Sequence, residues 1–414
     1  MSVDDLSASA LSDAVAAQRS LRADLGRHEL LNGLIGFLFS ATGPVAVILA
    51  VGRSAGLEPQ VVASWVAGVF VLNGLLTIVT SMVTRQPLAF FWTIPGTVVV
   101  GQAMAAGTTW PEVVGGFVMA AALMVALALS GQVERVMRLL PMPVVMAMVA
   151  GVFLHFGTDL VHAVDDDVAL AGAMVAAFVA VSAVPALARW VPAVLVALVV
   201  GVAVVLAQGS SVQTSGRWLV DPAWQAPVFH ASVLVELAIP LVITVIVVQN
   251  GQGMAVLHAA GHRPPMDRVT LACGVVSLLA APVGAASTCL AGPTNALVTA
   301  SGERRRHYAA AVACGVLAIV FGLFAPGMVR IITTMPGAFV AALGGLAMFK
   351  ALQGAFLTGF SGPFATGALV TFLVTVSDIT VLNIGSAFWG LLAGIVACAL
   401  LDAEKLVESR VSEG

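Results

Sequence analysis

The chain has 414 residues, of which 60% are hydrophobic and only 9% are charged, with a formal net charge of −3 and a mean hydropathy of +1.04. A soluble domain carries about 25% charged residues, so this composition excludes a water-soluble protein. The apolar runs are long and do not alternate with polar residues, which excludes a transmembrane β-barrel. The chain is therefore predicted to be an all-α integral membrane protein.

The first 27 residues are predicted to form a cytosolic tail. They open with Met1-Ser-Val-Asp-Asp5, which is acidic where a signal peptide is basic, and no apolar run occurs before Leu30. From Leu30 to Leu401, apolar runs long enough for membrane spans follow one another. The predicted membrane segments are fourteen in number and run over 30–51, 60–82, 87–106, 111–131, 142–160, 168–187, 190–207, 231–256, 268–283, 285–301, 307–325, 336–354, 364–378 and 381–401.

The placement of basic residues predicts the orientation of these segments. With the N-terminus inside, fifteen of the 18 Lys and Arg residues fall on the inner side, and only Arg53, Arg217 and Arg330 fall outside. Inner loops carry such an excess of Lys and Arg. We therefore predict a multi-pass protein of the inner (plasma) membrane with both termini in the cytoplasm. Lys350 and Asp378 are expected near span ends, where they snorkel or cap.

The two halves of the chain resemble each other. A basic lead-in, a proline and a Gly/Ala-rich span occur around Pro143 and again around Pro336, about 193 residues later. Seven predicted segments separate the copies, and an odd number reverses the orientation. The sequence therefore predicts a 7+7 inverted repeat, over 28–207 and 230–402, which is typical of secondary transporters.

Segments three and ten are predicted to be broken. Segment three contains Pro95-Gly96 and segment ten contains Gly292-Pro293, about 197 residues apart at matching places in the two halves. Each is expected to enter the membrane as an extended stretch and continue as a half-helix. The two helix starts would face one cavity and favour an anion, such as a carboxylate, without any fixed cation. Proline kinks that serve only helix packing are the alternative.

Polar groups at membrane depth complete the candidate site, because each must find a partner or a ligand. The predicted substrate-binding residues lie at the two breaks and in segment eight; they are Phe91, Thr93, Gly96, Thr97, Gln249, Asn250, Gly292, Thr294 and Asn295. Glu236 in segment eight and His155 in segment five are the candidates for proton coupling. The alternatives are contacts between helices for the amides, helix capping for Thr294 and Asn295, and core packing for Phe91. The four cysteines have no metal or redox spacing, and no metal or cofactor is predicted.

Three motifs resemble those of the benzoate/proton symporter family of the BenE type. They are Arg135-Val-Met-Arg138-Leu-Leu-Pro, then Gln249-Asn250 with His258-Ala-Ala-Gly261 downstream, and Gly385-Ser-Ala-Phe-Trp389-Gly-Leu-Leu-Ala-Gly394. The similarity extends over about residues 28–402. It implies the fold of uracil permease and of the sulfate-type anion transporters, and it implies an elevator mechanism.

The resemblance also implies a domain organisation. A core domain over 28–132 and 230–326 would move against a gate domain over 133–210 and 327–402. An outer loop at 211–229 and a cytosolic C-terminal tail at 403–414 complete the chain. Uracil-type transporters have a glutamate where this chain has Gln249 and another near Thr294-Asn295. Both positions are neutral here, which suits an anionic substrate and leaves the proton carrier open.

The leading hypothesis is a secondary transporter that imports an aromatic carboxylate, benzoate above all, coupled to protons. A nucleobase or inorganic anion transporter of the same fold and an anion channel are the alternatives. An enzyme is not expected, because the membrane segments contain no cluster of His, Asp and Glu. The expected partners are the small anion, the proton and the lipid bilayer, and no nucleic acid. The oligomeric state is left open, with a homodimer as one arrangement.

Overall fold

The computed structural model describes residues 21–139, 141–184, 191–208, 216–300, 302–333, 335–361, 364–377, 379, 381 and 386–401. The predicted C-terminal tail, residues 1–20 of the predicted N-terminal tail, Gly385 of the third motif and Asp378 lie outside these residues.

The described chain is built almost wholly from helices, and eight of those described are long and apolar enough to cross a membrane. They are α3 (Arg27–Ser54), α4 (Pro59–Thr84), α6 (Trp110–Leu129), α8 (Met142–Asp166), a continuous helix Ala231–Ala259, Met266–Val283 including α15 (Met266–Ala280), Arg304–Leu323 including α17 (His307–Leu323), and α19 (Gly337–Phe360). The protein is therefore a multi-pass helical membrane protein, as predicted.

Shorter apolar helices account for the remaining predicted segments. They are α5 (Ile94–Ala105), α9 (Val168–Ser182), α11 (Ala193–Ala207), α16 (Gly292–Val298), α20 (Ala365–Val376) and α21 (Ser386–Leu401). A 12-residue helix such as α5 spans only about 18 Å, less than the roughly 30 Å of the hydrocarbon core. The count of fourteen segments therefore stays a prediction. Short helices α2 (Leu21–Asp24), α7 (Val133–Leu139) and α18 (Ala325–Thr333) flank the spans.

Predicted segment eight is one helix with two wide turns. It consists of α12 (Ala231–Val233), a π-helical stretch Leu234–Ala238, α13 (Ile239–Ile243), a second π-helical stretch Thr244–Asn250, and α14 (Gly251–Ala259). Pro240, in α13, has no N–H for the helical ladder. π-Helical turns are frequent at functional sites, and the second one ends at the Gln249-Asn250 pair.

Segments three and ten are interrupted, as predicted. Strand β1 (Phe90–Trp92) precedes α5, and strand β2 (Thr288–Leu290) precedes α16. The two strands pair antiparallel, with Phe90 opposite Leu290 and Trp92 opposite Thr288. This pairing was not predicted. It satisfies backbone groups that would otherwise be exposed at membrane depth, where each unpaired group costs several kcal/mol.

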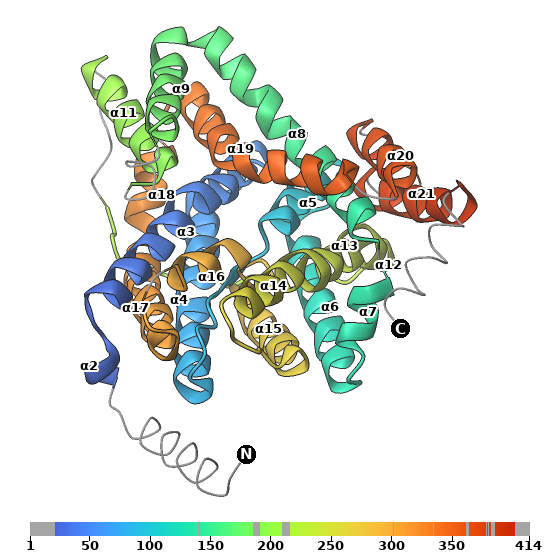
Figure 1. Ribbon diagram of the computed structural model, residues 1–414. Helices are drawn as coiled ribbons and strands as arrows, with labels where there is room; N and C mark the ends of the chain where they lie inside the picture. Colours follow the sequence, from blue (N-terminus) through green and yellow to red (C-terminus); the bar gives the residue numbers. More distant parts are fainter. Residues whose placement is uncertain are drawn as a thin grey trace, which may run out of the picture.

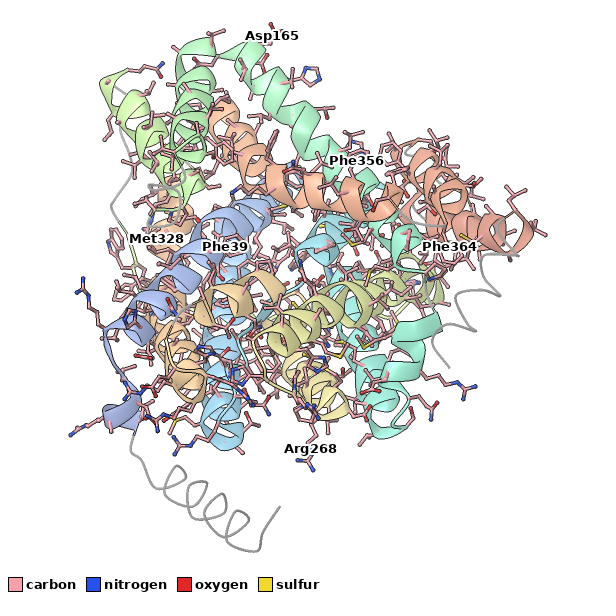
Figure 2. The ribbon with its side chains drawn as sticks, viewed as in Figure 1. Phe39, Asp165, Arg268, Met328, Phe356 and Phe364 are labelled. Carbon is pink, nitrogen blue, oxygen red and sulfur yellow. The ribbon has the colours of Figure 1, made fainter. Side chains whose placement is uncertain are left out.

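The helices gather into two groups. In one group α19 packs along α8, α20 on α21, and α11 on α9; in the other α17 packs on α3 and α4, and α15 on α6. Figure 1 shows the first group along the upper edge of the view, with α4, α6, α15 and α17 below it. Figure 2 shows Asp165 and Arg268, which are predicted to lie on opposite sides of the membrane, at opposite ends of the molecule.

Small residues permit the close packing of α4 on α17. A Cβ atom added at Gly74 would lie only 2.7 Å from the backbone oxygen of Gly315, and one added at Gly315 would lie 2.7 Å from that of Gly74. Interfaces between membrane helices are enriched in such residues, because lipid gives no hydrophobic drive for association and close van der Waals packing replaces it. This packed pair supports the strand pair, since Phe70 of α4 contacts Trp92 with ring centroids 5.2 Å apart.

Candidate functional site

A cavity of about 370 Å³ lies where the two helix groups meet, and we call it the central cavity. Segments of both groups line it. On one side lie α3, the start of α5, the end of the second π-helical stretch with α14, and the start of α16. On the other side lie α8 and α19. Its lining includes Phe39, Pro44, Ile94, Pro95, Phe153, Gln249, Gln252, Pro293 and Lys350. The two prolines of the broken segments, Pro95 and Pro293, thus reach the same cavity, as the sequence predicted.

The start of α5 is already capped from within. The Thr93 side chain accepts a hydrogen bond from the Gly96 N–H at 3.1 Å, and the Thr97 hydroxyl donates to the Thr93 carbonyl at 3.0 Å. Thr93 also donates to the Thr244 hydroxyl at 3.0 Å, which ties the half-helix to the π-helical stretch. Thr93, Gly96 and Thr97 are not among the residues that line the central cavity. They position the helix start.

Asn295 and Asn250 hold the two strands. The Asn295 Oδ1 accepts from the Ala89 N–H at 3.0 Å, and its Nδ2 donates to the carbonyls of Ala89 at 2.9 Å and Ala291 at 2.8 Å. The Asn250 Oδ1 accepts from the Leu290 N–H at 2.8 Å. Both side chains are fully buried behind the cavity lining. Each amide therefore replaces a backbone partner for a strand that has only one neighbour.

Thr294 and Gly292 lie beside the cavity without lining it. The Thr294 hydroxyl is 3.0 Å from the Ser40 hydroxyl of α3, a buried contact that joins α16 to α3. A Cβ atom at Gly292 would lie 2.6 Å from Cγ of Gln252, so glycine leaves room for that glutamine. Gln252 itself lines the central cavity.

Of the nine predicted substrate-binding residues, Gln249 alone lines the central cavity. The ring of Phe91 instead packs against Phe70 and Trp92, with centroid distances of 5.8 and 6.0 Å, in the buried core. The rings that line the cavity belong to Phe39 of α3 and Phe153 of α8. These two were not singled out in the sequence, because isolated phenylalanines in apolar spans carry no distinguishing pattern.

Lys350 is the main residue that sequence reasoning misplaced. The predicted segment ended at residue 354, which set Lys350 near a span end, but α19 continues to Phe360. Lys350 therefore has ten further helical residues after it, about 15 Å of helix, and it lines the central cavity. The expectation of a site without a fixed cation is corrected accordingly. An ionisable residue at membrane depth is a functional candidate, and that signal was present in the sequence.

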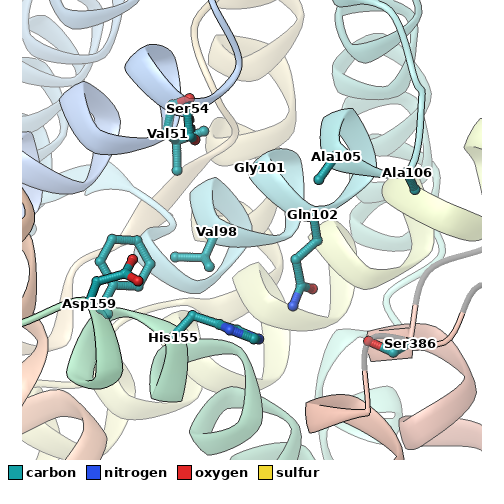
Figure 3. A pocket seen from close by; sticks show the side chains of 11 residues that line it. Val51, Ser54, Val98, Gly101, Gln102, Ala105, Ala106, His155, Asp159 and Ser386 are labelled. Atoms are coloured by element: carbon teal, nitrogen blue, oxygen red, sulfur yellow. Dashed lines mark hydrogen bonds between the residues drawn. The ribbon is translucent and has the colours of Figure 1, made fainter. Parts of the chain in front are cut away.

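A second cavity, of about 440 Å³, lies between α5 and α8 and is called the outer cavity. Its polar lining consists of Ser54, Gln102, His155, Asp159 and Ser386. Figure 3 shows the Gln102 amide extending from α5 toward the helix α8 that carries His155 and Asp159. The buried Nε2 and Oε1 atoms of Gln102 have no hydrogen-bond partner within the described residues. His155 and Asp159 are four residues apart on one helix face.

Glu236 lines neither cavity. It is 6% exposed in the first π-helical stretch and accepts a hydrogen bond of 3.4 Å from the Thr108 hydroxyl. Its Oε1 has no hydrogen-bond partner among the residues described. The two residues predicted for proton coupling are therefore in different environments, and of the two cavities described, His155 lines the outer one.

Known proteins resemble this chain along most of its length. It is 29% identical over 378 residues to the inner membrane protein YdcO of Escherichia coli (strain K12), covering 90% of this chain and 95% of that protein. It is 25% identical over 390 residues to the benzoate membrane transport protein of Acinetobacter baylyi, covering 92% and 97%.

Two solved transporters share the fold. The transmembrane domain of the cyanobacterial bicarbonate transporter BicA matches with a TM-score of 0.61 at 16% identity, over 89% of this chain and 97% of that one. The murine Solute Carrier 26 family member A9 anion transporter, in its inward-facing state, matches with a TM-score of 0.58 at 14% identity, over 91% and 68%. Residues 23–400 match the family described as benzoate membrane transport protein, so the chain belongs to the benzoate membrane transport protein (BenE) family.

Proposed function

We propose that this protein is a secondary active transporter that imports an aromatic carboxylate, benzoate or a close analogue, together with protons. The observation that carries the proposal is the lining of the central cavity. It combines one cationic side chain, Lys350, with the amides of Gln249 and Gln252 and the rings of Phe39 and Phe153. A flat apolar monoanion needs both kinds of contact. The volume of about 370 Å³ is in the range of small-molecule sites.

The carboxylate would lie between Lys350 and Gln249, near the start of α5. The ammonium group attracts the anion, and the amide donates a hydrogen bond while remaining neutral. The aromatic ring would pack against Phe39 and Phe153, where its burial is favourable in proportion to the apolar area removed from water. The helix dipole of α5 adds partial positive charge at the same end of the cavity.

Transport would proceed by an elevator motion of the predicted core domain against the predicted gate domain. The position of the cavity supports this mechanism, because Gln249 belongs to the predicted core and Lys350 to the predicted gate. A ligand between them would respond to any relative movement. Fourteen segments in a 7+7 inverted repeat, with both termini in the cytoplasm, are part of the proposal.

For proton coupling, the outer cavity favours His155 over Glu236. His155 and Asp159 line it together with Gln102, whose amide is available to a water or a proton-bearing group. A histidine ring nitrogen can accept and release a proton, which is the chemistry that a proton carrier requires. Glu236 is the second candidate, because a buried carboxyl group with an unpaired oxygen can also hold a proton.

The test is uptake into proteoliposomes of labelled benzoate, bicarbonate, sulfate and uracil, with and without an inward proton gradient. We expect saturable benzoate accumulation that depends on the gradient. The bicarbonate arm is included because the structurally similar BicA is a bicarbonate transporter. Accumulation of an inorganic anion or of uracil in preference to benzoate would contradict the substrate assignment. Uptake that only equilibrates and never saturates would indicate a channel.

A further inference from the structure

A third cavity, of about 490 Å³, lies at the end of the molecule that is predicted to face the cytoplasm, and we call it the basic cavity. It is lined by Arg85, Gln86, His262, Arg263, Arg304 and Arg305. These residues come from the end of α4, the loop before α15 and the turn before α17. Three segments far apart in the sequence therefore converge on one space.

The positive charge of the basic cavity is only partly compensated. Glu303 pairs with Arg305, with Nε and Oε2 2.6 Å apart, but neither Arg263 nor Arg304 forms an ion pair with any described residue. Burial lowers the pKa of His262 to about 4, with further contributions from His307 and Arg304. His262 is therefore neutral at pH 7. The space holds an excess of guanidinium groups and a neutral imidazole.

The cavity walls are held in place by contacts of their own. The Arg85 guanidinium lies 4.7 Å from the centre of the Tyr308 ring and donates a hydrogen bond to its hydroxyl, which in turn donates to Asp24 at 2.8 Å. The Gln86 side chain accepts from the Arg263 N–H at 3.1 Å. These contacts fix the Arg85 guanidinium and the backbone at Arg263, and Arg263 and Arg304 line the same cavity with exposed side chains. Planar guanidinium groups with several N–H donors recognise phosphate.

The helix turns of α4 just before Arg85 carry exposed apolar side chains. Val79, Met82 and Val83 on the last turns of α4 are 50%, 44% and 80% exposed, and Arg85 follows directly. Exposed valines on a membrane helix face lipid chains. A phosphate group in the basic cavity could therefore be attached to acyl chains lying along α4. Basic pockets between membrane helices at the cytoplasmic side suit the headgroups of anionic lipids.

We propose that the basic cavity binds the phosphate group of an anionic phospholipid. The headgroup would bridge Arg263 and Arg304, and the acyl chains would follow Val79 and Val83. A bound lipid would link the end of α4 to the loops before α15 and α17, all within the predicted core domain. The site lies apart from the central cavity, so this assignment does not depend on the transported substrate.

The experiment uses the full chain in phosphatidylcholine nanodiscs, with phosphatidylglycerol added in increasing amounts, and reads both bound phosphatidylglycerol by native mass spectrometry and thermal stability. The test variant is Arg263→Gln with Arg304→Gln. The matched control is Arg135→Gln with Arg268→Gln, which removes the same charge from exposed residues of α7 and α15 outside the cavity. In a parallel titration, sodium phosphate is added in place of phosphatidylglycerol.

The parent and the control variant should bind phosphatidylglycerol and be stabilised by it. The test variant should need about thirtyfold more phosphatidylglycerol for the same binding. This factor combines roughly fivefold for each arginine lost near a membrane surface. An equal loss in the control variant, or no preference of the parent for phosphatidylglycerol, would overturn the proposal. Stabilisation by inorganic phosphate that competes with the lipid would assign the site to a soluble phosphate instead. Gel filtration of both variants checks that they fold.

Discussion

Gln249 is neutral where the resemblance to uracil-type transporters implies a glutamate, and it lines the central cavity across from α19, which carries Lys350. We expect Gln249→Glu to weaken benzoate binding about a hundredfold near neutral pH. A new carboxylate at about 5–6 Å from the substrate costs roughly 3 kcal/mol at an effective dielectric of about 20. Acidification should restore part of the affinity, because the new carboxyl group becomes protonated.

The measurement is equilibrium binding of labelled benzoate at pH 7.5 and at lower pH. Gln249→Met, which has nearly the same shape and no charge, is the matched control and should lose only about tenfold, as expected for one hydrogen bond to a charged group. Unchanged affinity of Gln249→Glu at pH 7.5, in a folded variant with an ionised carboxylate, would show that Gln249 does not face the substrate.

Lys350 provides the positive charge on the opposite wall of the cavity. Replacing it by methionine should lower benzoate affinity about tenfold, because its exposed ammonium group is partly screened by water. Lys350→Arg should retain most of the affinity. The diagnostic probe is benzamide, a neutral ligand of similar shape, whose binding should not depend on this charge. Equal losses for benzoate and benzamide would mean that Lys350 acts through packing.

At the scale of elements, the paired strands β1 and β2 depend on two buried amides. Asn295→Ala would remove three hydrogen bonds to Ala89 and Ala291 and leave the buried Ala89 N–H without a partner among the described residues. The carbonyls of Ala89 and Ala291 would keep the N–H groups of Ala291 and Asn295. An unsatisfied buried N–H costs about 1–3 kcal/mol, so we expect the variant to be destabilised by that amount. Thermal unfolding of the detergent-solubilised protein should show a lower midpoint. Asn32→Ala on α3 is a control at another buried asparagine, away from the strands.

Benzoate binding by Asn295→Ala distinguishes a substrate-ligand role of Asn295 from a structural role. As a substrate ligand it would change benzoate affinity with little effect on stability. If Asn295 acts structurally, as its hydrogen bonds indicate, the Ala variant should have a lower unfolding midpoint. Its benzoate affinity should then fall only as a consequence, because the start of α5 is no longer held in place. A variant with unchanged midpoint and reduced affinity would contradict the structural role.

The breaks in segments three and ten could be predicted because Pro-Gly and Gly-Pro pairs have a direct effect on backbone geometry. Their pairing as strands could not be predicted, since three-residue strands carry no periodic signal. The amide cluster in segment eight was identified from polarity alone, but polarity cannot tell Gln249, which lines the cavity, from Asn250, which bonds Leu290. Lys350 was misplaced because the end of its helix was predicted six residues early.

At the scale of the whole molecule, the residues that we propose for proton coupling and for substrate binding line different cavities. We expect His155→Gln to abolish accumulation driven by a proton gradient while benzoate counterflow continues, because exchange needs no net proton movement. Glu236→Gln should retain gradient-driven uptake. The two variants, compared in the same proteoliposomes, identify the coupling residue. The reverse pattern would assign coupling to Glu236, and loss of counterflow in His155→Gln would indicate a role in the transport path itself.

The elevator mechanism requires that α3 move relative to α19, and one close contact between them allows a direct test. A Cβ atom added at Gly43 of α3 would lie 3.4 Å from Cβ of Ala347 of α19, close to the Cβ separation of about 3.8 Å that a disulfide requires. We therefore expect the double variant Gly43→Cys with Ala347→Cys to cross-link under mild oxidation. The native cysteines are buried, so we expect them to form few competing disulfides; they are Cys273, Cys289, Cys314 and Cys398.

The cross-link should stop benzoate uptake and counterflow, because it joins the predicted core domain to the predicted gate domain in one conformation. Reduction should restore both, and each single-cysteine variant should transport under oxidising conditions. Binding of benzoate to the cross-linked protein should persist if the cavity is accessible in this conformation, which separates a blocked movement from a damaged site. Transport at the parental rate by fully cross-linked protein would show that α3 and α19 move together. The substrate would then have to cross by local gating around the central cavity, and the division into a moving core and a static gate would have to be abandoned.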